Sequence, residues 1–247
     1  MKIIHSLSNS IVKLRPRKGC KDVWNAFMAK GAKFCEHDIP FCPTTATKLP
    51  TDIITWEEAK RIYRDNLKKK NRKFKHNAFV CFYIDDYKFD GSNGIWFKYK
   101  YALKVLSHFE GVISPDFSTY QDFPEPIKLD ATYKMRLMGY WFGICGLQVI
   151  NNVRWGTEET YSYCFTGIPQ NSIVAIGTVG GSPRKHIDRK RFHQGLNKMI
   201  EALKPHTIIV YGSAQYECFD KLKQKGVCIL SFKSQTSRVF ERRKCYE

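Results

Sequence analysis

Aspartates follow apolar runs at two points of the chain. Asp85 and Asp86 come directly after the run at 79–84, and Asp116 follows the run at 112–114. If these runs are neighbouring parallel strands, the three carboxylates lie near each other at one edge of the sheet. Such a group can bind a divalent cation that also contacts phosphate, and Asp116 can act as a base. Asp116 can equally be a turn former without a chemical role, because aspartate is common in turns.

A third apolar run continues into a polar group, Asn151-Asn152-Val153-Arg154-Trp155-Gly156. Amides and an arginine that extend a buried strand are unfavourable unless they are hydrogen-bonded, so they should bind something specific. The guanidinium of Arg154 suits a bidentate contact with phosphate or carboxylate, which makes it a candidate anion clamp in a catalytic site with the three aspartates. Its alternative partner is a structural carboxylate such as Glu158 or Glu159.

Two further runs end in small polar residues and glycines. Thr178-Val179-Gly180-Gly181 precedes a basic stretch and a helix-like segment, where backbone N–H groups could cradle an anion. The spacing matches neither the dinucleotide fingerprint nor the P-loop. Tyr211-Gly212-Ser213 ends the next run, and its glycine allows a ligand to approach closely. The predicted phosphate- or ligand-binding residues are Asn151, Asn152, Thr178, Gly180, Gly181, Tyr211, Gly212 and Ser213.

The charge of the chain points to a polyanionic partner. It has 41 Lys and Arg against 23 Asp and Glu, a formal net charge of +18, and such an excess attracts nucleic acid. The stretch 60–75 holds nine basic residues and one Asp, more than a helix dipole accounts for. A solvated helix end and general solubility remain the alternative readings. The predicted contacts with a DNA or RNA backbone are Lys68, Lys69, Lys70, Arg72, Lys73, Arg184, Lys185, Arg189, Lys190 and Arg191.

The cysteines indicate buried thiols more than a metal centre. There are nine, an odd number without tight spacing, which does not favour a secreted disulfide framework. The tightest group is Cys35, His37 and Cys42, with Cys20 upstream. It lacks the paired Cys knuckle of a structural zinc site, so these residues are weak metal candidates. The cofactor that the sequence does suggest is a divalent metal at the aspartates.

Six apolar runs predict the sheet that must hold these residues, and most are followed by a helix-like stretch. Continuous β-branched runs are typical of strands buried on both faces. We therefore expect an α/β fold with a mostly parallel sheet of about six strands, either an incomplete TIM-like barrel or an open doubly wound sheet. The runs lie at 79–84, 112–114, 147–150, 173–176, 207–210 and 227–230.

Pro and Gly residues and a helix-capping motif set the expected domain limits. Residues 1–54 contain repeated Pro and Gly and should form an irregular segment packed on the core, while 55–247 should form a single α/β domain. Thr55 with Glu58 makes a capping box for a helix at 56–69. No apolar run approaches the ~20 residues of a membrane span, and the start resembles no signal peptide. We expect a cytoplasmic protein of a bacterial host with no membrane partner.

The chain resembles a family, DUF4417, over 111–232. The likeness rests on Ser114-Pro115-Asp116-Phe117-Ser118-Thr119-Tyr120, Val149-Ile150-Asn151-Asn152-Val153-Arg154-Trp155, Gly167-Ile168-Pro169, Ile173-Val174-Ala175-Ile176-Gly177-Thr178 and Ile208-Ile209-Val210-Tyr211-Gly212. Asp38-Ile39-Pro40 with Cys42 also fits. The family commonly has an acidic residue where Thr166 stands here, which argues against a catalytic role at that position. The resemblance implies a phage or mobile-element context and no particular activity.

Three functions agree with these features. The first is a nucleic-acid-acting protein of a phage or mobile element that performs metal-dependent phosphodiester chemistry. The second is a non-catalytic module that binds nucleic acid or a host or phage protein, as an accessory of replication, defence or counter-defence. The third is a sugar- or nucleotide-directed enzyme on a barrel scaffold. The first two differ in whether the aspartates converge and lie open or are engaged in internal ion pairs.

Overall fold

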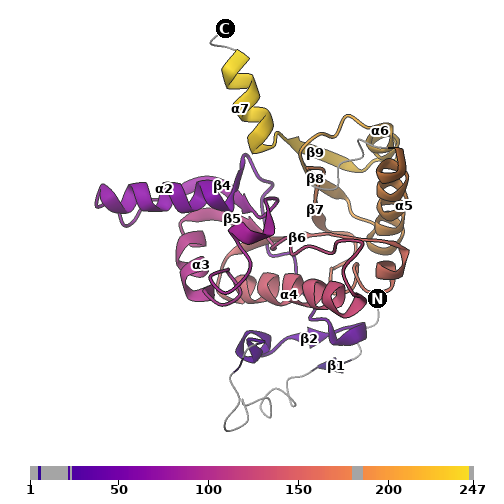
Figure 1. The fold of residues 1–247 in the computed structure, drawn as a ribbon, viewed down its shortest axis with the longest axis horizontal. Coiled ribbons are helices and arrows are strands. Elements are labelled where there is room, and N and C mark those ends of the chain that lie inside the picture. Colours follow the sequence, from indigo (N-terminus) through magenta and orange to yellow (C-terminus); the bar gives the residue numbers. More distant parts are fainter. Residues whose placement is uncertain (1–4, 7–21, 23, 180–185, 245–247) are drawn as a thin grey trace.

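The computed structural model describes residues 5–6, 22, 24–179 and 186–244, and its centre is a parallel sheet of seven strands (Figure 1). The strands are β3 (Ile53–Thr55), β4 (His76–Cys81), β5 (Phe109–Ile113), β6 (Gln148–Asn152), β7 (Ile173–Gly177), β8 (Thr207–Tyr211) and β9 (Cys228–Phe232). Each strand pairs with the next one in the chain. The curled sheet is a half-barrel. The incomplete barrel is therefore confirmed, and the doubly wound alternative is wrong because such a sheet reverses its strand order.

All six predicted runs contribute strands, β4 to β9, but the predicted count is one too low. The missing strand is β3, which pairs in parallel with β4 through only three residues. A run of this length gives no periodic signal. The sheet thus begins at Ile53. A separate antiparallel pair, β1 (His5–Ser6) and β2 (Lys33–Phe34), lies outside the half-barrel.

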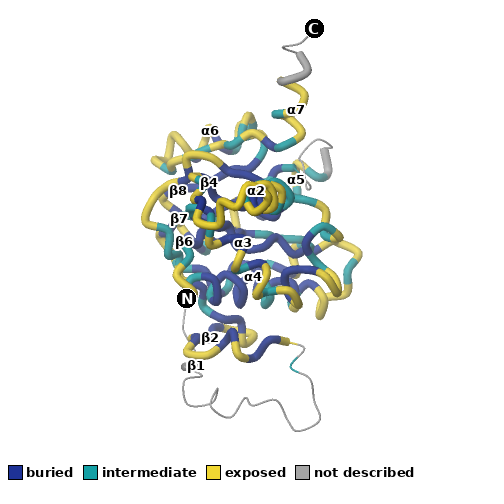
Figure 2. The backbone as a smooth tube through the Cα atoms, turned by 90° about the vertical axis from the view of Figure 1, so that its left-hand side faces the viewer, coloured by how far each residue is buried: buried dark blue, intermediate teal, exposed yellow. Residues whose placement is uncertain are grey.

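Helices cover one face of the half-barrel. They are α2 (Trp56–Lys68), α3 (Tyr99–Leu106), α4 (Glu125–Ile144), α5 (His186–Leu203) and α6 (Glu217–Gln224). The last helix, α7 (Gln235–Lys244), projects away from the sheet (Figure 1). Short 3-10 turns are η1 (Ala26–Ala29), η2 (Glu36–Asp38), η3 (Asp86–Lys88) and η4 (Glu158–Ser162). Alternate strand residues such as Val80 and Val112 pack against α2, α3 and α4. The intervening ones, such as Phe79, Ile113 and Ile209, fill the concave face with strand side chains. Figure 2 shows the buried strands beneath exposed helix surfaces.

The capping box of α2 forms as predicted. The Thr55 hydroxyl accepts the Glu58 backbone N–H at 3.3 Å, and the Glu58 carboxylate accepts the Thr55 backbone N–H at 2.9 Å. Two of the orphan donors at the helix start are thereby satisfied. Glu58 also accepts from Arg238 of α7 at 3.1 Å, and Asp52 lies 3.7 Å from the same guanidinium. Arg238 therefore connects the last helix to the first strand of the sheet.

A segment from the N-terminal part of the chain enters the sheet. The backbone N–H of Thr45 donates to Val149 of β6 at 3.0 Å, and the Thr44 hydroxyl reaches Ile173 of β7 at 3.5 Å. β6 and β7 pair through only two register positions. Residues 44–45 therefore lie between the beginnings of these strands, while the strands stay paired at their carboxyl ends. In the described ranges, no helix is long and apolar enough to cross a bilayer.

Candidate functional site at the carboxyl edge of the sheet

The predicted site residues gather at one edge of the half-barrel, because all seven strands point the same way. Each predicted strand-end residue lies at or just beyond the end of its strand. Asp85 follows β4, Asp116 follows β5, Asn152 ends β6, Thr178 follows β7, and Tyr211 ends β8. The prediction that they share an edge is confirmed.

Four of the side chains at this edge form a continuous chain of hydrogen bonds, which we call the rim network. The Tyr83 hydroxyl donates to the Asn152 side-chain oxygen at 2.9 Å, and the Asn152 amide donates to Asp116 Oδ1 at 2.8 Å. Arg154 Nη1 donates to the other oxygen, Oδ2, at 3.1 Å. The Asp116 side chain is 8% exposed and that of Arg154 is 21% exposed. The network therefore runs from the buried interior outward to a guanidinium.

Asp116 accepts hydrogen bonds on both oxygens, and the three aspartates, all among the described residues, do not form a group that could hold a metal ion. Asp85 turns to Lys88 at 3.0 Å, and Lys88 also pairs with Glu57 at 3.2 Å. Among the residues that the structure describes, no group of three or more His, Cys, Asp or Glu side chains is placed to hold a metal ion. Cys35, His37 and Cys42, which are among these described residues, do not form such a group either. The arrangement provides an oriented cation in place of the expected carboxylate cluster.

Asp86 stays close to the rim network and has an unusual environment. Its Oδ1 accepts a hydrogen bond from the Ser118 hydroxyl at 2.9 Å. Burial raises the pKa of the carboxyl, and the Asp116 and Asp90 charges raise it further, while Ser118 and the Arg154 charge oppose the shift. Asp86 is therefore easier to protonate than an ordinary aspartate.

The β5–α4 loop, residues 114–124, holds this edge together. Its Ser114 hydroxyl accepts the Asn152 backbone N–H at 2.8 Å. Further along, Asp116 binds Arg154, and Ser118 binds Asp86. The side chain of Gln121 then accepts a hydrogen bond from Arg191 of α5. One loop thus fixes groups from the segment after β4, from β6 with the residues after it, and from α5.

Arg136 of α4 binds backbone carbonyls at the same edge, and it was not predicted from the sequence. It is fully buried and donates to the backbone carbonyls of Asn152 at 3.0 Å, Cys164 at 2.8 Å and Thr166 at 3.0 Å. Burial lowers the pKa of its guanidinium to about 10. The signal was present, since a lone arginine stands beside Met135 in the apolar part of α4. Its role is to position the end of β6.

The other predicted ligand-binding residues are engaged internally. Asn151 donates to the Cys42 carbonyl at 2.8 Å. The Thr178 hydroxyl donates to the Ser213 carbonyl at 3.0 Å, and the Tyr211 hydroxyl accepts the backbone N–H of Gln235 at 3.0 Å. Gly212 has a φ of 117°, which favours glycine there. These residues shape the edge. The predicted Gly180, Gly181, Arg184 and Lys185 lie outside the described residues.

The predicted basic residues divide between two surfaces. Arg189 and Lys190 are exposed at the start of α5, with the partly exposed Arg191 beside them, at the carboxyl edge. The other group belongs to the end of α2 and the turn after it, which lead into the beginning of β4. There Lys75 donates to the Ser107 carbonyl, just before β5, at 2.7 Å. The basic end of α2 therefore lies at the opposite edge from the rim network, where Figure 1 shows α2 extending away from the sheet.

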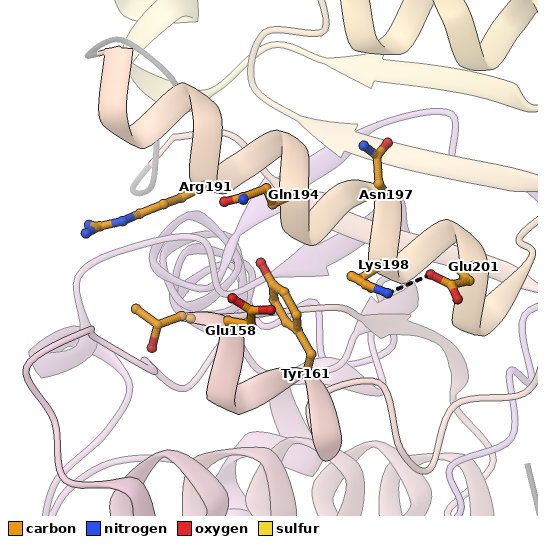
Figure 3. A pocket seen from close by; sticks show the side chains of 9 residues that line it. Glu158, Tyr161, Arg191, Gln194, Asn197, Lys198 and Glu201 are labelled. Atoms are coloured by element: carbon orange, nitrogen blue, oxygen red, sulfur yellow. Dashed lines mark hydrogen bonds and ion pairs between the residues drawn. The ribbon is translucent and has the colours of Figure 1, made fainter.

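A polar hollow adjoins the carboxyl edge along α5 (Figure 3). Trp155 packs against α5 where Gly195 leaves no side chain, since a Cβ there would overlap the indole. The segment after β6 is thereby held close to α5, and a space of about 400 Å³ remains between residues 156–161 and α5. Its lining residues are Gly156, Thr157, Glu158, Tyr161, Arg191, Gln194, Asn197, Lys198 and Glu201. Figure 3 shows Tyr161 and Glu158 rising from η4 toward the side chains of α5.

Comparisons with known proteins find that the chain is similar to phage proteins. It is 30% identical to the Gene 1 protein of Mycobacterium phage L5 over 142 residues, 58% of this chain and 60% of that protein. It is 29% identical to the Gene 1 protein of Mycobacterium phage D29 over 135 residues, 55% of this chain and 48% of that protein. The aligned part thus spans half to three fifths of these relatives. No solved structure matches the chain significantly. A family model, "Domain of unknown function (DUF4417)", matches residues 33–233, so the chain belongs to this family.

Proposed function

We propose that this protein binds nucleic acid through the basic end of α2. The surface, which we call the basic face, consists of Arg61, Arg64, Lys68, Lys69, Lys70, Arg72 and Lys73. All seven are exposed, and none forms an ion pair with a described carboxylate. This concentration of uncompensated charge carries the proposal, because a phosphate backbone is the polyanion that such a surface attracts.

The neighbouring helix enlarges the basic face. α3 contacts α2, and its exposed Lys104 lies near the helix end that leads into β5. Tyr101, 42% exposed, lies against the α2 side chains Trp56 and Tyr63. An aromatic ring among cations is typical of surfaces that contact nucleic-acid strands, because bases stack on it while the cations follow the backbone.

The geometry at the other edge favours binding over phosphodiester cleavage. Both oxygens of Asp116 accept hydrogen bonds, and one of the donors is the Arg154 guanidinium, whose positive charge stands where a metal ion would otherwise be attracted. Asp116 instead fixes Arg154. We therefore place the protein with nucleic-acid-binding accessory proteins of phages.

The test is the salt dependence of binding. We expect the parent protein to bind a fluorescent DNA or RNA oligonucleotide, and the affinity to fall steeply with salt as counterions are released. Replacing Lys68, Lys69, Lys70, Arg72 and Lys73 by Gln should flatten the log–log slope by up to about 4.5 units on duplex DNA, at roughly 0.9 per lost phosphate contact. Fluorescence anisotropy at several salt concentrations measures this slope.

A matched control removes the same number of charges elsewhere. Lys30, Lys48, Lys221, Lys223 and Lys225 are exposed and lie outside the basic face and the hollow along α5. Their replacement by Gln changes the net charge equally and should leave most of the slope intact. Equal effects of the two five-residue variants would mean that only net charge matters, which contradicts a defined binding face.

A further inference from the structure

We infer that the carboxyl edge of the half-barrel binds a phosphate group through Arg154 and Arg191, supplied by a mononucleotide or by the terminal phosphate of a strand. This site lies at the opposite edge from the basic face, so it does not rest on the proposed function. The shared chemistry is a phosphate monoester beside a nucleoside.

Arg154 is held in place by groups more buried than itself. Asp116 receives one of its N–H groups, and Asn152 and Tyr83 hold Asp116 in turn. Among the described residues, no other hydrogen bond to this guanidinium is found, although a guanidinium carries five N–H donors. Because the carboxylate is fixed from behind, the fork of Arg154 is oriented before a ligand arrives. A planar fork with free donors suits a phosphate in a bidentate contact.

Arg191 of α5 supplies a second cation that binds the same β5–α4 loop. It donates to the side chain of Gln121, a neutral amide that orients the guanidinium without cancelling its charge. The anchors Asp116 and Gln121 are five residues apart on the β5–α4 loop, so their Cα atoms are at most about 18 Å from each other. The exposed Arg189 and Lys190, two residues and one residue before Arg191, add positive charge to this edge.

The hollow beside Arg191 fits the rest of a nucleotide. Its volume of about 400 Å³ lies in the range of small-ligand sites. The amides of Gln194 and Asn197 can pair with the polar edge of a base, and Tyr161 offers a ring for stacking. In Figure 3, Arg191 lies at one end of the row of α5 side chains, with the Lys198–Glu201 pair at the other. The phosphate would then face the rim network.

Asp86 makes this site sensitive to pH. It faces Asp116 and Ser118 of the β5–α4 loop, Arg154 beyond β6, and Asp90 of its own segment. An ionised Asp86 repels a bound phosphate, whereas a protonated one does not. Anion binding should therefore weaken as pH rises through the raised pKa of Asp86. Asp86→Asn should bind several-fold more tightly than the parent at neutral pH and lose that pH dependence.

The experiment is isothermal titration with sulfate, adenosine 5′-monophosphate, and one oligonucleotide with and without a 5′-phosphate. Sulfate keeps its charge over the tested pH range and isolates the titration of Asp86. Arg154→Lys keeps a counter-ion for Asp116 but loses the fork, and Arg191→Gln changes a partly exposed helix residue. Each should weaken anion binding at least about tenfold with an unchanged melting temperature. Arg61→Gln on α2 is the matched control.

The outcomes separate the two sources of phosphate. Tighter binding of adenosine 5′-monophosphate than of either oligonucleotide assigns the site to free nucleotides. Tighter binding of the 5′-phosphorylated oligonucleotide than of the monophosphate and of the unphosphorylated oligonucleotide assigns it to strand ends. The inference is overturned if the parent binds none of these probes at millimolar concentration. It is equally overturned if both arginine variants bind them like the parent. Since Arg191 is tied only to Gln121 among the described residues, its variant gives a clear answer even if Arg154→Lys unfolds.

Discussion

At the scale of single residues, the position of Asp116 decides how the site is interpreted. A strand-end aspartate is equally consistent with a metal ligand, a base and a turn former. The structure gives it a different role, as the counter-ion that orients Arg154. Asp85, one residue before the half-buried Asp86, pairs instead with Lys88 on the exterior. Asp85 and Asp116, which both follow a strand of the sheet, therefore differ in environment.

This difference predicts unequal effects of one substitution. Asp116→Asn leaves the partly buried Arg154 without its counter-ion, so the free energy of unfolding should fall by about 1.5–3 kcal/mol, the range for hydrogen bonds to charged groups. Asp85→Asn removes an exposed pair and should cost less than about 1 kcal/mol. Urea unfolding measures both. A larger loss for Asp85→Asn would show that the rim network contributes little to stability.

At the scale of elements, the sequence identified those parts whose information is local. β4 to β9 were predicted because each is a continuous apolar run, and α2 because Thr55 and Glu58 form its cap within four residues. β3 was missed because three residues carry no period. The connections made by the β5–α4 loop could not be predicted, since its partners lie far away in the chain and depend on the curl of the sheet.

The clearest long-range connection is that of α7. It is largely polar and was not predicted as a helix, yet Arg238 reaches Glu58 and Asp52 at the start of the half-barrel. We expect Arg238→Ala to increase hydrogen exchange of the α7 amides by at least tenfold while α2 stays protected. Lys233→Ala, which breaks an exposed pair with Glu241, is the control. Unchanged exchange in Arg238→Ala would mean that α7 is held by its other contacts alone.

At the scale of the whole molecule, the two proposed binding surfaces occupy opposite edges of one sheet. Sites without shared partners contribute additively when they are well separated. The five-residue variant of the basic face should therefore bind adenosine 5′-monophosphate like the parent. Arg191→Gln should in turn keep the salt slope of the parent for an oligonucleotide without a 5′-phosphate. Titration measures binding of the monophosphate, and anisotropy measures the salt slope. If either variant also alters the property that belongs to the other surface, the two surfaces form one continuous ligand surface.

The strand order of the half-barrel also has a consequence for how the chain folds. Since every strand pairs with its predecessor, each βα unit can join the sheet as it emerges from the ribosome, and each strand pairing spans a single connection. Connections with the N-terminal part of the chain and with α7 depart from this order. The segment at 44–45 must wait for β6 and β7, more than 100 residues later, and Arg238 must find Glu58 across 180 positions. These connections should form last, so refolding should show a fast phase for the strands and a slower phase for residues 44–45 and α7.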